Sequence, residues 1–443
     1  MKRNEKADAA KATGAAVSEV ASVVEDMHKA FADPIFSATA VRLGKAFGLD
    51  EKIDLDSAAE VRSNYGLRAN IYRAVRGTSV LTGEGVAWML GQLKEDPEAV
   101  SIHDTKRGAT AISALNTAFG DNLKIRGSSL APEMALKAHG HTVLPSQEDL
   151  AEAYPHADST IVIFVHGLGA TEYVWGATHE SFGHHLHEEF GYTPLYVRYN
   201  TGANIYQNGA DFALLTQLIY DNWPVKVDNI ILIGHSMGGL VIRSACAQVV
   251  AALEESISAG TGLEDKQGDA WTDHVRQIFY IGSPHRGAPM ERVANQAIGQ
   301  MENFNRSRPL VPLLNKRSAG IKDLRFGTIL VDELGEAATD PSSSHRDLAE
   351  HKDVMPLPGA EHHLIVGYKM SPSRGRAAEM LGDVIVPADS ASAKSDGVNR
   401  SDFEGGQYHA VEGISHIPMM NNPQVYEVIR GEVARYASEG SDS

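Results

Sequence analysis

The feature that most constrains the fold of this chain is a series of short, continuous apolar runs rich in β-branched residues. They occupy residues 161–165, 195–199, 230–233, 278–281 and 364–367. Strands that are buried on both faces of a sheet have this composition. Helical patterns lie between the early runs, at residues 210–223 and 240–253. Because strands alternate with helices, we predict an α/β fold with a mostly parallel sheet covered by helices.

The pattern divides the chain into two regions. Residues 1–157 are mainly helical in pattern and end in a predicted β-hairpin over residues 134–144, which turns at Gly140. The polar stretch after this hairpin is the expected boundary, so residues 158–443 form the second domain. Within that domain, residues 288–361 are too long for a simple crossover between strands, and we predict a cap or lid insertion there.

Charge and cysteine content restrict the partners of the chain. Lys and Arg total 40 and Asp and Glu total 57, so the net charge is −17. Such an acidic surface repels phosphate backbones and anionic membranes, which excludes nucleic acid as an expected partner. Cys246 is the only cysteine, so no intrachain disulfide is possible. No continuous apolar stretch follows the charged start of the chain, and we therefore expect a cytoplasmic protein.

The strongest motif is Gly-His-Ser-Met-Gly at residues 234–238. An apolar run leads directly into it and a helical pattern leads directly out, as in a sharp strand-to-helix turn that exposes its apex serine. The hydroxyl of Ser236 would then lie above the sheet, at the positive end of the following helix. A glycine-rich turn whose serine only caps a helix is the alternative, and the flanking pattern disfavours it.

A second glycine-containing loop, residues 165–169 (Val-His-Gly-Leu-Gly), follows the first run. If Ser236 attacks an acyl carbonyl, two backbone N–H groups should meet the developing oxyanion, and we predict those of Met237 and Leu168. We expect their neighbours to contact the substrate: His166, Gly167 and His235. A dinucleotide fingerprint would need Gly or Ala where Glu172 stands, so this alternative is disfavoured.

Ser236 needs a base, and the base needs an orienting acid. With the chain order Ser, acid, His, the acid should follow a late strand and the histidine the last one. Asp383 follows the run at 364–367 and is the first choice, with Asp396 as the runner-up. For the base we predict His416, in the loop after a strand at 407–413, over His409 within that strand.

These motifs resemble those of bacterial lipases and esterases of the α/β-hydrolase superfamily. The matching stretches are residues 165–168, 234–239, 282–287, 382–387 and 413–416. The chain looks most like the inositol-deacylase-related (PGAP1-like) group, and the resemblance implies Asp383 and His416 as partners of the serine. Residues 317–327 and 115–123 also look like parts of this bacterial group, and we interpret both segments as structural.

The expected activity is therefore hydrolysis of carboxylic esters, by a Ser236–His416–Asp383 triad, on a small-molecule or lipid ester. We expect no cofactor and no metal. The histidines at 184, 185 and 187 are more typical of a solvated helix face than of a metal site, because the spacing of a zinc motif is incomplete. Two alternatives stay open: an acyltransferase or thioesterase with the same triad, and a non-catalytic scaffold whose N-terminal helices recruit a partner or contact a lipid surface. The sequence leaves the oligomeric state open.

Overall fold

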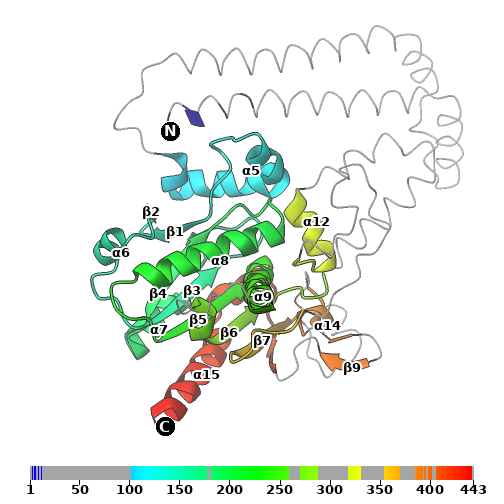
Figure 1. The fold of residues 1–443 in the computed structure, drawn as a ribbon. Coiled ribbons are helices and arrows are strands. Elements are labelled where there is room, and N and C mark those ends of the chain that lie inside the picture. Colours follow the sequence, from blue (N-terminus) through cyan, green and yellow to red (C-terminus); the bar gives the residue numbers. More distant parts are fainter. Residues whose placement is uncertain are drawn as a thin grey trace, which may run out of the picture. The chain divides into compact units, whose positions relative to one another are not determined.

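The described residues of the computed structural model form an α/β structure around one large sheet (Figure 1). The structure describes residues 2, 4, 5, 8, 11, 101–176, 181–258, 270–287, 318–330, 354–369, 383, 386–392, 394–395, 398–401 and 406–441. Predicted helices before residue 101 lie outside these residues, as does most of the predicted insertion at 288–361.

The sheet contains eight strands in the order β10-β7-β6-β5-β3-β4-β1-β2. Every neighbouring pair from β10 to β4 is parallel. The strands of this parallel part are β3 (Thr160–Val165), β4 (Thr193–Arg198), β5 (Asn229–His235), β6 (Val275–Ile281), β7 (Glu361–Tyr368) and β10 (Gln407–Glu412). The predicted parallel sheet is confirmed, and its carboxyl ends all meet at one edge, where ligands bind in open α/β sheets.

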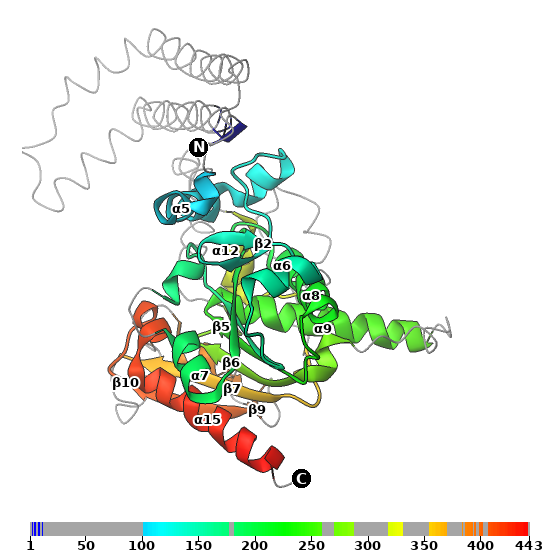
Figure 2. The same ribbon diagram turned by 90° about the vertical axis from the view of Figure 1, so that its left-hand side faces the viewer.

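Helices cover both faces of the sheet, as Figures 1 and 2 show. Ile161 and Ile163 of β3 pack in one core with α8 (Ile205–Asn222) and α9 (Met237–Ser258). Val162 and Phe164 face the opposite side and pack in a second core with α7 (Phe182–Phe190) and α15 (Pro423–Ser441). Successive side chains of a strand point to opposite faces, so a strand between two helical layers must be apolar throughout.

The predicted hairpin forms, but it belongs to the main sheet. Its strands are β1 (Ala135–Ala138) and β2 (His141–Val143), and β1 pairs with β4 in antiparallel register. The sheet therefore begins before the predicted boundary at residue 157. The physical reason that β1 joins the sheet is the burial of Leu136. This apolar side chain is fully buried, and the core of the main sheet provides the apolar surroundings that it needs.

Four further α-helices of this unit lie within the described residues. They are α5 (Lys106–Ile125), α6 (Gln147–Ala153), α12 (Ala319–Phe326) and α14 (Ala388–Ala391), and a small separate ribbon joins β8 (Lys394–Ser395) to β9 (Val398–Ser401). The compact unit with the sheet comprises residues 103–127, 131–292 and 318–443.

A second unit comprises residues 1–102, 128–130 and 293–317. Among its described residues, Glu5 is buried and accepts hydrogen bonds from the Ser101 hydroxyl and from the Ile102 N–H, the latter at 3.0 Å. Asp8 accepts bonds from the N–H and the hydroxyl of Ser129, at 2.8 and 2.7 Å. Acidic side chains therefore tie the start of the chain to these two later segments.

One helical stretch within the described residues, Met237–Glu255 of α9, is long and apolar enough to cross a membrane by length and composition. Its mean hydropathy is 1.3, and 56% of it is buried inside the protein. Packing against the sheet accounts for this apolar composition.

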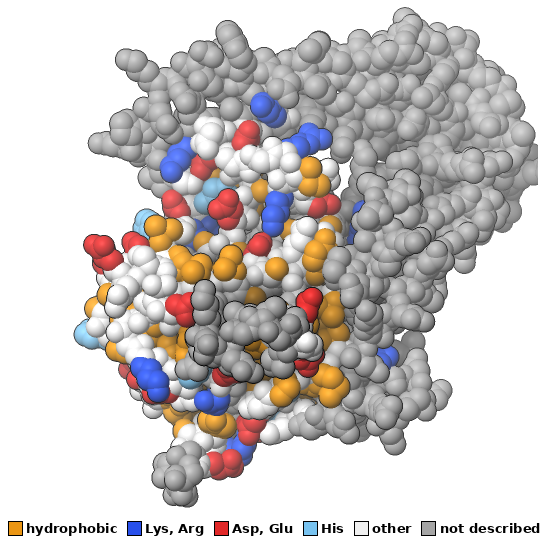
Figure 3. Space-filling model, in the orientation of Figure 1, with side chains coloured by type: hydrophobic (Ala, Val, Ile, Leu, Met, Phe, Trp, Pro, Cys, Tyr) orange, Lys and Arg blue, Asp and Glu red, His pale blue; other side chains and the backbone are white. Residues whose placement is uncertain are grey.

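Figure 3 shows acidic, basic and apolar side chains interspersed over the described part of the face that carries α8.

Candidate active site

Ser236 lies at the apex of a sharp turn between β5, which ends at His235, and α9, which begins at Met237. Its φ angle is +53°, a left-handed conformation that costs a non-glycine residue energy. Two hydrogen bonds hold the turn: the Ser236 N–H donates to the Ile281 carbonyl at 2.9 Å, and the Gly239 N–H donates to the Ser236 carbonyl at 3.1 Å. Strain that is maintained in this way is typical of a functional site.

The loop after β3 lies directly against this turn. A Cβ atom added to Gly167 would be 3.0 Å from the Cβ of Ser236, closer than most side chains approach, so a larger residue there would push against the serine turn. The N–H of Gly169 donates to the Thr201 hydroxyl at 3.2 Å, which fixes the end of the loop. Leu168 lies between these two glycines and is half-buried, whereas Met237 is fully buried. N–H groups in the first turn of a helix have no partner within the helix, so the N–H of Met237, the first residue of α9, can meet an anion.

Asp383 and His416 come together in the loops that follow β7 and β10. The Nδ1 of His416 and the Oδ2 of Asp383 are 2.7 Å apart, and both side chains are buried. The His416 N–H also donates to the Asp383 carbonyl at 3.1 Å. The other carboxylate oxygen, Oδ1, accepts a bond from the Val386 N–H at 2.8 Å. Both carboxylate oxygens are thus satisfied, and the imidazole is held in one orientation.

Two neighbours place this pair beside the serine turn. The ring of His235, the residue before Ser236, lies 4.7 Å from the His416 ring, measured between centroids. The Nε2–H of His235 donates to the His416 carbonyl at 3.1 Å. At Gly282, where φ is +58°, an added Cβ would be 3.1 Å from the Asp383 Oδ2. The ends of β5, β6, β7 and β10 therefore converge on one place.

We predicted substrate contacts for His166 and His235, but both imidazole rings pack inside the protein. His166 is fully buried and stacks on the Tyr199 ring, with the ring centroids 4.6 Å apart. The Nδ1–H of His166 donates to the Gly167 carbonyl at 3.0 Å, and the Tyr199 hydroxyl donates to the His166 carbonyl at 2.7 Å. These contacts brace the loop that carries Leu168.

Burial makes His166 a source of acid sensitivity. Desolvation lowers the pKa of His166 to about 4, while the unfolded histidine titrates near 6.5. Unfolding therefore takes up a proton between these values, and stability falls as the pH drops through this window. We expect His166 to account for about 2 kcal/mol of the fall in the free energy of unfolding between pH 7 and pH 5. Urea titrations of wild type and His166→Asn at both pH values measure this contribution. An equal fall in both proteins would contradict the prediction.

Most of the candidates that the sequence analysis disfavoured have other roles in the structure. His409 is on β10, where its ring contacts His363 rather than the serine turn. Asp396 lies outside the described residues. Glu172 is buried in an ion pair with Arg198, which explains an acid at that position of the glycine loop. His184 and His187 of α7 are exposed, as predicted, whereas His185 is half-buried and its ring centroid lies 4.9 Å from that of Tyr426.

The sequence did not reveal how the loop after β4, residues 200–204, is held next to the glycine loop. The side-chain amide of Asn200 donates to the Gly120 carbonyl of α5 at 2.9 Å, and the Gly320 N–H of α12 donates to the Gly202 carbonyl at 3.2 Å. The two helices also bind each other, because the Ser318 hydroxyl donates to the Thr117 carbonyl at 2.6 Å. The described residues of the two segments interpreted above as structural, 115–123 and 318–327, thus form one clamp.

Asp323 of α12 completes this clamp at the start of α8. Its Oδ2 accepts bonds from the Ile205 N–H at 2.8 Å and the Asn204 side-chain amide at 3.1 Å. A buried carboxylate at a helix N-terminus satisfies otherwise unpaired donors. We expect Asp323→Ala to lower the free energy of unfolding by about 2 kcal/mol, measured by urea titration. Asp221→Ala, at the exposed C-terminal end of the same helix, is the control, and an equal effect there would contradict this role.

A family model described as the Alpha/beta hydrolase family matches residues 162–427 of the chain. The search of curated proteins found no match to the chain. Similar solved structures include lipase BlEst2 of Bacillus licheniformis in its mature form, 17% identical, covering 61% of this chain and 90% of that one with a TM-score of 0.36. A lipase-esterase related protein from Clostridium acetobutylicum is 14% identical, with coverage of 62% and 94% and a TM-score of 0.34. A Pyrobaculum calidifontis esterase is 13% identical, with coverage of 80% and 97% and a TM-score of 0.36.

The family match spans more than half of the chain and contains Ser236, Asp383 and His416. It also contains the whole parallel part of the sheet except the first residues of β3. The chain therefore belongs to the Alpha/beta hydrolase family.

Proposed function

We propose that this protein is a serine hydrolase that cleaves carboxylic esters, with Ser236 as the nucleophile, His416 as the base and Asp383 as its orienting acid. The observation that carries the proposal is the buried 2.7 Å contact of His416 with Asp383, beside a serine with a φ of +53°. A positive φ at a strand-to-helix apex and an oriented imidazole are the two features that activate a serine hydroxyl.

The proposed reaction has two acyl-transfer steps. Ser236 attacks the ester carbonyl while the Nε2 of His416 takes its proton, and the N–H groups of Met237 and Leu168 stabilise the oxyanion. His416 then protonates the departing alcohol. In the second step it removes a proton from water, which attacks the acyl-enzyme and releases the acid. Asp383 orients the ring and stabilises the imidazolium that forms in each step.

Two finer parts of the proposal concern the substrate. The insertion at residues 288–361 would act as a lid over an acyl pocket, and the clamp through Ser318 and Asp323 supplies one firm anchor for it. The resemblance to the inositol-deacylase-related group would make the alcohol part of the ester a polyol or lipid head group. Activity on p-nitrophenyl esters of increasing acyl length measures the first part, because a lidded apolar pocket favours longer chains.

The direct test of the proposal is labelling by an active-site fluorophosphonate, followed by mass mapping of the modified peptide. We expect one phosphonylated site per chain, at Ser236, together with hydrolysis of p-nitrophenyl esters by the same preparation. Labelling without hydrolysis, but with acyl transfer to an added alcohol, would favour the acyltransferase alternative. A folded protein that neither reacts with the probe nor hydrolyses esters would contradict the proposal and favour a scaffold.

A further inference from the structure

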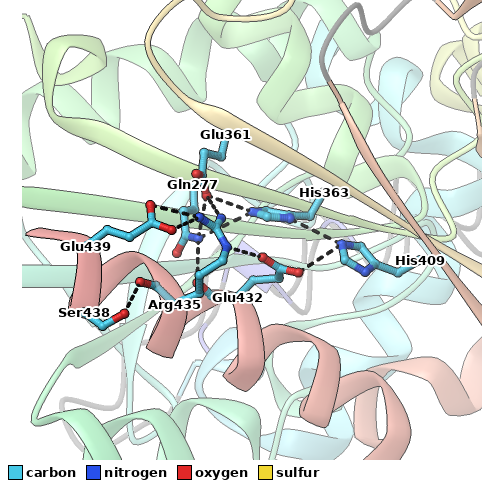
Figure 4. Close-up of polar contacts among 8 residues, drawn as sticks. All are labelled: Gln277, Glu361, His363, His409, Glu432, Arg435, Ser438 and Glu439. Atoms are coloured by element: carbon cyan, nitrogen blue, oxygen red, sulfur yellow. Dashed lines mark hydrogen bonds and ion pairs between the residues drawn. The ribbon is translucent and has the colours of Figure 1, made fainter.

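A cluster of titratable side chains lies apart from the serine turn, where β7, β10 and α15 meet (Figure 4). His363 comes from β7, His409 from β10 and Glu432 from α15, and they are the only group of three such metal-ligand side chains found within the described residues. We propose that these three residues bind a divalent transition metal ion of the zinc type. This site is independent of the proposed ester hydrolysis.

The geometry of the cluster matches the needs of such an ion. In the parallel register His363 lies opposite Gln407, so His409, two residues further along β10, lies on the same face of the sheet. The Nδ1 of His363 and the Nε2 of His409 are 3.4 Å apart. Two nitrogens bound to one tetrahedral Zn²⁺ are separated by about 3.3 Å, because each Zn–N bond is about 2.05 Å.

The third ligand atom comes from the helix that packs over these strands. The Oε1 of Glu432 is 3.9 Å from the Nε2 of His409, and the three ligand atoms all lie within 4.8 Å of one another. His363 is fully buried, whereas the side chains of His409 and Glu432 are 18% and 19% exposed. Three protein ligands with partial access to solvent leave a fourth position for water, a common arrangement for zinc.

Other side chains hold the ligands in these orientations. The far ring nitrogen of His363, Nε2, lies 3.5 Å from the Oε2 of Glu361 and 3.4 Å from the Gln277 amide nitrogen. A carboxylate in this position orients metal-binding histidines in general. The Arg435 Nε donates to the Oε2 of Glu432 at 2.9 Å, which leaves Oε1 for the ion. Gln277 donates to the Glu361 carboxylate at 3.0 Å and to the Glu432 carbonyl at 3.1 Å. The dashed contacts in Figure 4 form one connected network.

Charge in the cluster also favours a cation. Three carboxylates, of Glu361, Glu432 and Glu439, surround the guanidinium of Arg435, so the acids outnumber the base. Imidazole nitrogens select Zn²⁺ and its neighbours over Mg²⁺ or Ca²⁺, which prefer oxygen ligands.

Bound metal would fasten the C-terminal helix to the edge of the sheet. β10 is the edge strand of the sheet, and the loop after its C-terminal end carries His416. The ion would join β7, β10 and α15 at one point, so its main effect is on stability. A free Zn²⁺ concentration about one hundred times the Kd raises the Tm of a domain of this size by about 5 °C.

The test uses the full-length chain, freed of metal by a chelator and then titrated with Zn²⁺ or Mg²⁺ in calorimetry and thermal melts. We expect one tight Zn²⁺ per chain, the stated rise in Tm, and no rise with Mg²⁺. His409→Ala and Glu432→Gln should each weaken Zn²⁺ binding more than about 100-fold. Both positions are partly exposed, so these variants should fold, and circular dichroism checks that they do. Visible absorption of bound Co²⁺, displaced by Zn²⁺, gives an independent measure in the wild type.

Two matched variants should keep the tight site. Glu439→Gln removes a carboxylate that binds Arg435 without removing a ligand, and His141→Ala removes an exposed histidine at the opposite edge of the sheet. Zn²⁺ binding that survives in His409→Ala and Glu432→Gln would overturn the proposal. The absence of tight binding in folded wild type would do so as well, and would make the cluster a proton-linked ion-pair network.

Discussion

Replacing Ser236 by Ala is expected to lower kcat for p-nitrophenyl ester hydrolysis by about 10⁶-fold, while the protein stays folded. The reason is chemical: without the hydroxyl no acyl-enzyme can form, and only binding and oxyanion stabilisation remain. The residual rate should still exceed the uncatalysed rate by about 10³-fold, because the N–H groups of Met237 and Leu168 are unchanged. Relief of the positive φ at residue 236 is not expected, since alanine also carries a Cβ.

Initial rates of wild type and Ser236→Ala, with purity confirmed by mass, measure this effect. Ser258→Ala is the matched control, because Ser258 is an exposed residue at the far end of α9. Its kcat should stay within about twofold of wild type. If Ser236→Ala retained wild-type activity, Ser236 would not be the nucleophile and another residue would carry the reaction.

Much of this fold and candidate site follows from local patterns. The run at residues 161–165 predicts β3 because a strand covered on both faces has no polar position, and the packing of Val162 and Ile163 into opposite cores shows why. The turn around Ser236 is predictable for a similar reason: a strand and a helix joined without a loop leave one residue at the apex. Chain order then indicated Asp383 and His416, which the structure brings into contact.

What sequence reasoning missed depends on contacts between distant segments. The hairpin of β1 and β2 has no local sign that it joins β4, since strand pairing is set by the register of both partners. The clamp of α5 and α12 relies on single hydrogen bonds such as that from Ser318 to Thr117, about two hundred residues apart in sequence. The cluster of His363, His409 and Glu432 lacks a compact motif, because each residue comes from a different element. A pair of histidines on neighbouring parallel strands is recognisable only once the strand order is known.

Replacing Asp383 by Asn should lower kcat by about 10⁴-fold with little change in KM. The hydrogen bonds of Asp383 determine how the new amide would lie. The Val386 N–H donates to Oδ1, so the amide oxygen must keep that place, and its NH₂ group must face the Nδ1 of His416. Nδ1 would then accept a hydrogen bond, which puts the ring proton on Nε2. A base with its proton already facing Ser236 cannot take another, so the tautomer alone blocks the reaction.

Asp396→Asn is the matched control for Asp383→Asn, because Asp396 is the runner-up for the orienting acid in the sequence analysis. We expect its kcat to stay within about twofold of wild type. Because the amide preserves the size and both hydrogen bonds of the Asp383 side chain, the thermal stability of Asp383→Asn should change much less than its kcat. A large loss of kcat in Asp396→Asn with normal activity in Asp383→Asn would reverse the assignment of the acid. Equal and small losses in both would mean that His416 is oriented by its backbone contacts with Asp383 and His235, without an acid.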